Sequence, residues 1–113
     1  VITNPTHFAV AIKYQPNEND APIIVAMGKD SMALRVIEEA ESNSVSIVRS
    51  PLLARALFYT GGIGNAISEQ LYSAVASILA YVYQLERGVS TALQDPDIPS
   101  DFIFDEFGKP TKE

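Results

Sequence analysis

The chain has 113 residues, of which 47% are hydrophobic, with a formal net charge of −6, one histidine and no cysteine. This composition supports one small domain with a real core, and no apolar run is long enough to span a bilayer. Disulfides, thiolate metal sites and histidine metal clusters are excluded, so we expect no metal and no cofactor. The absence of a basic stripe argues against nucleic acid or an anionic membrane surface as a partner.

The first half of the chain predicts an antiparallel hairpin. Residues 8–14 alternate large apolar residues with alanine and lysine, which indicates a strand. Residues 15–20 are polar and contain Pro, Asn and Asp, so they predict a turn. Residues 22–27 are apolar and β-branched, which is typical of a strand covered on both faces. Because Ala9 and Ala11 are small, another element can pack closely on their side of the sheet.

Helices and one more strand follow. Asp30 is placed to cap a helix that ends near residue 42, and residues 45–49 form a short strand, so a parallel crossover is predicted. Ser50 and Pro51 open a second helix, because proline is favoured at the first helical position. Ser68 is predicted to cap the longest helix, which ends near Gly88. The predicted fold is therefore α/β: a small mixed sheet of about four strands flanked by helices.

Charge divides the chain into two predicted regions. Residues 1–87 carry eight acidic and six basic residues, whereas residues 88–113 carry six acidic and two basic residues and are rich in proline. We interpret 1–87 as the folded domain and 88–113 as an extended acidic tail that is partly disordered. The tail also contains large apolar side chains such as Phe102 and Phe104, so docking of part of it is left open.

The Asn4-Pro5 bond carries the most specific chemistry. Proline has no backbone N–H, so the usual attack on an asparagine side chain by the following residue cannot occur. The side-chain amide of Asn4 can instead attack its own carbonyl carbon and release Pro5. Asn is favoured first and Pro second in a β-turn, and a tight turn supplies the proximity that this reaction needs. Thr6 and His7 can polarise the carbonyl or help a proton leave.

The Asn-Pro motif is part of a longer series of sequence segments. In chain order these are Val1–Tyr14, Ala21–Gly28, Ser50–Leu57, and Leu71–Ala76 followed by Leu79–Tyr83. In this order they resemble the cytoplasmic domain of the FlhB/YscU family, the export-switch proteins of type III secretion. The resemblance covers about residues 1–87, and the residues in these blocks are more similar to the flagellar branch than to the virulence branch. Met27 stands where lysine is common and Ser68 where proline is common.

The resemblance implies a function. The chain would cut itself once between Asn4 and Pro5, with Thr6 and His7 shaping the turn, and so would not be a turnover enzyme. The cut would switch export from rod and hook substrates to filament substrates. Implied partners are other export-gate proteins, the hook-length ruler protein, and export substrates or chaperones. Arg55, in the resembling Leu-Ala-Arg block, is a candidate partner-binding residue.

The resemblance also implies a location, and two alternatives stay open. The domain would lie on the cytoplasmic side of the bacterial inner membrane, attached through a preceding membrane domain that this chain lacks. The first alternative is a virulence-type secretion homologue. The second is a passive docking module of the export apparatus with an inert Asn-Pro turn, which predicts an unbroken chain between Asn4 and Pro5.

Overall fold

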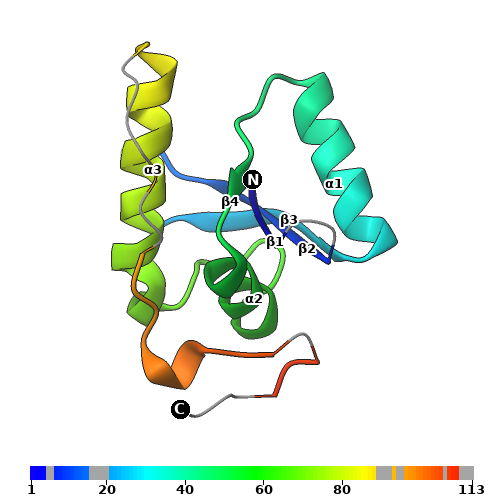
Figure 1. The fold of residues 1–113 in the computed structure, drawn as a ribbon, viewed down its shortest axis with the longest axis vertical. Helices are drawn as coiled ribbons and strands as arrows, with labels where there is room; N and C mark the ends of the chain where they lie inside the picture. Colours follow the sequence, from blue (N-terminus) through cyan, green and yellow to red (C-terminus); the bar gives the residue numbers. More distant parts are fainter. Residues whose placement is uncertain (5–6, 16–20, 89–92, 94–95, 106, 110–113) are drawn as a thin grey trace.

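The computed structural model describes residues 1–4, 7–15, 21–88, 93, 96–105 and 107–109 (Figure 1). Four strands form one sheet in the order β3-β2-β1-β4. They are β1 (Ile2–Asn4), β2 (Phe8–Lys13), β3 (Ile23–Lys29) and β4 (Val48–Arg49). β2 is antiparallel to both of its neighbours, whereas β1 is parallel to β4. The predicted mixed sheet and its hairpin are thus confirmed, although β4 is shorter than the predicted strand at 45–49.

Helices cover both faces of the sheet (Figure 1). They are α1 (Ser31–Ser42), α2 (Pro51–Thr60) and α3 (Tyr72–Glu86), with 3-10 turns η1 (Glu69–Leu71) and η2 (Ser100–Phe102). The crossover from β3 through α1 leads to β4, which runs in the same direction as β3. α2 begins with Pro51 at its first turn, as the sequence predicts.

The core follows from the alternation along β2. Phe8 and Val10 are fully buried and pack with side chains from α2 and α3. Ala9, on the opposite face, is also fully buried, and α1 packs against β2 and β3 there. At Ala9 the small side chain admits the predicted close packing, whereas Ala11 lines a hollow between the sheet and α1. Large side chains fill one face of the sheet, and α1 covers part of the other.

Two predictions about secondary structure are wrong. The sequence predicts that both faces of β3 are covered, but the side chain of Val25 is 49% exposed. β3 is also an edge strand of the sheet. An apolar run cannot distinguish an edge strand from a central one; here Ile24 N–H donates to Asn65 O at 3.0 Å and so shields part of that edge. The longest helix was expected to start at Ser68. α3 instead starts at Tyr72, after η1, and the Ser68 hydroxyl donates to the Gln70 side chain and makes no capping bond to the backbone.

The C-terminal segment docks on the domain where it is described. Ile98, Phe102 and Phe104 are partly buried against the core, and the rings of Phe104 and Tyr59 lie 5.8 Å apart. The docking that the sequence left open is therefore observed for these residues. Residues 89–92, 94–95, 106 and 110–113 of the predicted tail lie outside the described residues, and the division at residue 87 remains a prediction.

Candidate functional site at the Asn4 turn

Asn4 lies at the end of a central strand of the sheet. Its strand, β1, is bordered by β2 on one side and β4 on the other, and Asn4 pairs with Phe8. Ser50 N–H donates to Thr3 O at 2.9 Å, which extends the parallel pairing almost to Asn4. Asn4 itself is only 8% exposed. The position of its backbone is therefore set by its own pairing with β2 and, through Thr3, by β4, and not by the turn alone.

A short hydrogen bond closes the turn. His7 N–H donates to the carbonyl oxygen of Asn4 at 2.8 Å. This is the first-to-fourth-residue bond of the β-turn that the sequence predicts, with Asn4 first. Pro5 and Thr6, the two intervening site residues, lie outside the described residues. The bond draws electron density from the same carbonyl that the cyclisation would attack, and a donor held at a developing oxyanion assists acyl transfer.

The far end of the turn is open to water. The His7 side chain is 53% exposed, and its Nδ1 lies 3.5 Å from Asp30 Oδ1. Asp30 N–H also donates to His7 O at 2.8 Å. The sequence placed Asp30 only as a helix cap, so its contact with His7 was missed. The hairpin register that aligns Phe8 with Lys29 could have suggested it, since the next residues outward are His7 and Asp30.

An aromatic cluster packs around Phe8, next to the turn. The Phe8 ring packs edge-on against Phe58 at 5.1 Å and Tyr59 at 5.5 Å between centroids. The Lys29 ammonium lies 5.6 Å from the centre of the same ring. Because Phe8 pairs with Asn4 across the strands, this cluster fixes the start of β2 against α2. Such aromatic contacts add to the stability that area burial alone provides.

Comparison with known proteins shows the family of the chain. A family model described as the FlhB HrpN YscU SpaS Family matches residues 1–82. The chain belongs to this family. It is 51% identical over 82 residues to the flagellar biosynthetic protein FlhB of Aquifex aeolicus, covering 73% of this chain and 23% of that protein. It is 41% identical to FlhB of Escherichia coli K12, covering 100% of this chain and 31% of that protein.

Solved FlhB/YscU-type structures share the fold. The cytoplasmic domain of FlhB from Shewanella putrefaciens matches with a TM-score of 0.83 and 34% identity, covering 91% of this chain and 84% of that one. A mutated EscU C-terminal domain matches with a TM-score of 0.69 and 30% identity, covering 71% and 80%. The chain spans less than a third of the length of the two FlhB relatives above.

Arg55, the candidate partner-binding residue, contacts the chain itself. Its Nε donates to Phe104 O at 2.8 Å in a partly buried position. One edge of its guanidinium therefore ties the C-terminal segment to α2. A role of Arg55 in binding a partner remains a prediction.

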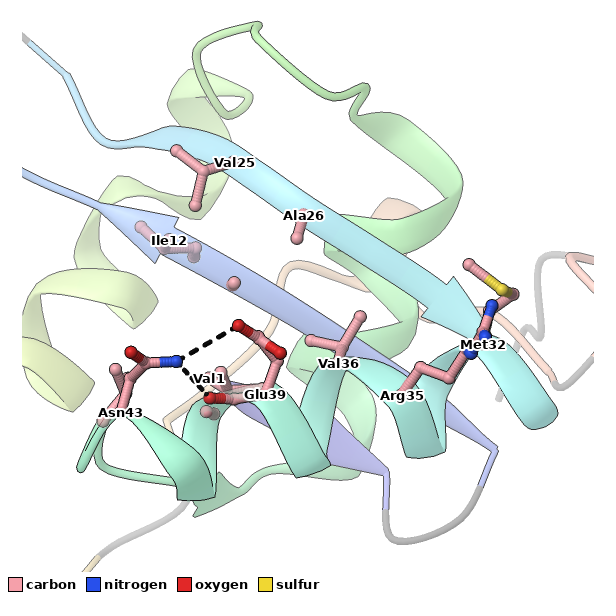
Figure 2. A pocket seen from close by; sticks show the side chains of 12 residues that line it. Val1, Ile12, Val25, Ala26, Met32, Arg35, Val36, Glu39 and Asn43 are labelled. Atoms are coloured by element: carbon pink, nitrogen blue, oxygen red, sulfur yellow. Dashed lines mark hydrogen bonds between the residues drawn. The ribbon is translucent and has the colours of Figure 1, made fainter.

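A hollow of about 770 Å³ lies under α1, away from the Asn4 turn. Figure 2 shows apolar side chains such as Val25 and Val36 lining it, with Arg35 and Glu39 also among the lining residues. The Asn43 amide donates to the Glu39 carbonyl at 2.8 Å and so occupies one end. In the described ranges no three His, Cys, Asp or Glu side chains gather as a metal site would require, and none of the described helices is both long and apolar enough to cross a membrane.

Proposed function

We propose that this chain is the self-cleaving switch domain of a flagellar type III export-gate component. The chain cuts itself between Asn4 and Pro5, and the cut changes export from rod and hook substrates to filament substrates. One observation carries the proposal: the buried carbonyl of Asn4 receives the His7 N–H at 2.8 Å. A hydrogen bond to the scissile carbonyl, inside a clamped turn, favours cyclisation.

The proposed reaction balances within the chain. The Asn4 amide nitrogen forms a bond to the Asn4 carbonyl carbon, and the bond from that carbon to the Pro5 nitrogen breaks. A proton leaves the attacking nitrogen, and the Pro5 nitrogen gains one and becomes a secondary amine. Asn4 is left as a succinimide, which water then opens. Each molecule reacts once, so the chain is not a turnover enzyme.

The position of β1 supports retention of the cut piece. Val1–Asn4 lies between β2 and β4, with Ile2 and Thr3 each only 4% exposed. Full burial of a side chain such as Ile2 contributes about 1.5–3 kcal/mol, and each ladder hydrogen bond adds about 0.5–1.5 kcal/mol. We therefore propose that the two pieces stay in one sheet after cleavage. The cut would change the surface of the turn and leave the fold intact.

The relatives support the wider assignment. The FlhB proteins above are flagellar biosynthetic proteins, and EscU domains have been solved with an asparagine, or the adjacent proline, replaced by alanine. We propose other export-gate proteins, the hook-length ruler protein, and export substrates or chaperones as partners. We also propose that a preceding domain anchors this one to the cytoplasmic side of the bacterial inner membrane.

Intact-mass measurement on denatured protein tests the proposal. The unmutated chain should separate into Val1–Asn4 and a remainder that begins at Pro5, because only the fold holds the pieces together. Asn4→Ala should stay joined, since it lacks the attacking amide, and its circular dichroism should remain that of the folded domain. Asn43→Ala, which removes an exposed asparagine amide at the end of α1, should cleave like the unmutated chain.

The same measurement separates the alternative. An unmutated chain that stays joined would identify a passive docking module with an inert turn. A cut product from Asn4→Ala would refute cyclisation by the asparagine amide.

A further inference from the structure

Asp30 holds an unusual position beside the turn. It follows β3 and directly precedes α1, where an aspartate commonly caps the helix with its side chain, but its side chain makes no capping hydrogen bond. Its backbone has φ 54° and ψ −116°, in the region that favours glycine. The residue therefore accepts an unfavourable backbone conformation and gives up a capping bond.

Two of its interactions go to His7, while its carbonyl accepts the Leu34 N–H at 3.1 Å as α1 begins. The Asp30 N–H donates to His7 O at 2.8 Å, and the Asp30 carboxylate lies 3.5 Å from His7 Nδ1. His7 is the residue whose own N–H bonds the Asn4 carbonyl. The main chain and the side chain of Asp30 thus both restrain a residue that bonds the scissile carbonyl.

We propose that Asp30 is a positioning residue for the cleavage, an inference that rests on the proposed self-cleavage. Its main chain fixes the closing residue of the turn. Its carboxylate accepts a hydrogen bond from His7 Nδ1–H, which leaves Nε2 as the acceptor nitrogen of the imidazole. Nε2 then takes the proton that leaves the Asn4 amide nitrogen and returns a proton to the departing Pro5 nitrogen. Asp30 acts through His7 and is therefore a positioning residue.

Asp30→Gly gives the sharpest test. Glycine keeps the N–H that bonds His7 and suits the positive φ, so only the carboxylate is lost. The cleavage rate, measured by intact mass on freshly synthesised chain quenched in acid, should fall about threefold to fivefold, the effect of one exposed ion pair. Thermal stability should stay close to that of the unmutated chain. Asp30→Asn, which keeps an acceptor oxygen, should cleave at an intermediate rate.

Two controls separate positioning from general damage. Ser44→Gly relieves the other described non-glycine residue with positive φ, at 58°, far from the turn in the sequence, and should leave the rate unchanged. In a His7→Ala background, Asp30→Gly should slow cleavage no further, because its effect acts through the imidazole.

The inference is overturned if the unmutated chain cleaves and Asp30→Gly cleaves equally fast, or if Asp30→Gly slows the His7→Ala chain as much as it slows the unmutated one. If the unmutated chain does not cleave at all, the proposed function fails, and this inference fails with it.

Discussion

The two ends of the Asn4 turn differ in burial and in main-chain pairing. Asn4 ends a central strand and is almost fully buried, whereas His7 and Asp30 lie more than half exposed at the rim. The end that would be attacked belongs to a strand with main-chain pairing on two sides, and the end that would move protons is open to water. Substitutions at the buried end should therefore change stability or abolish the cut, and those at the open end should change only its rate.

Removing apolar contact from β1 should have the largest effect. Ile2 pairs with Val10 and is 4% exposed within the core, so Ile2→Ala should lower the free energy of unfolding by about 2–5 kcal/mol. Urea unfolding measures this change best in an Asn4→Ala background, where the chain stays joined. Leu52→Ala, at a 40% exposed position on α2, is the matched control and should cost far less. Equal losses in both variants would mean that β1 is not held as the central strand.

Changing the open end should slow the cut without stopping it. His7→Ala keeps the N–H that bonds the Asn4 carbonyl and loses only the imidazole. We expect cleavage to slow by about a hundredfold, the low end for general acid–base catalysis, because water can reach the site. Intact-mass time courses give the rate, and thermal unfolding should be nearly unchanged. A variant as inert as Asn4→Ala would contradict the division between the two ends.

The local sequence pattern predicts most of the helices and strands but not the order of the strands in the sheet. The alternation in β2, the following hairpin and the proline at the start of α2 are visible in the sequence, and so is the turn that begins at Asn4. The central position of β1 is not, because it depends on pairing with β4, which lies more than forty residues further along the chain. The edge position of β3 escapes prediction for the same reason.

The candidate site shows the same limit. Asn4 and His7 are predictable because the chemistry of an Asn-Pro bond and the spacing of a turn are local. Asp30 is not, since its contact with His7 needs the end of β3 to return beside the turn and its backbone to adopt a positive φ. The docking of Phe104 involves a hydrogen bond from Arg55 and a ring contact with Tyr59, which composition alone leaves undecided.

The smallest effect should come from a region that belongs to neither end. Arg55→Ala removes the hydrogen bond to Phe104 O and should cost about 0.5–1.5 kcal/mol of stability. It should also make the C-terminal segment easier to cut by protease, while the rate at Asn4 stays the same. Arg49→Ala, an exposed arginine on β4, is the control and should change neither. A slower cut in Arg55→Ala would couple the C-terminal segment to the turn.

The mass of the released N-terminal piece tests the central claim most directly. Unmutated chain is quenched in acid soon after synthesis, denatured, and analysed for the Val1–Asn4 fragment. If the asparagine cuts its own chain, the fragment first appears lighter by one water than the free tetrapeptide acid, as a succinimide, and only later at the full mass. A chain that stays joined, or a fragment that carries the full acid mass from the earliest time, would contradict the account.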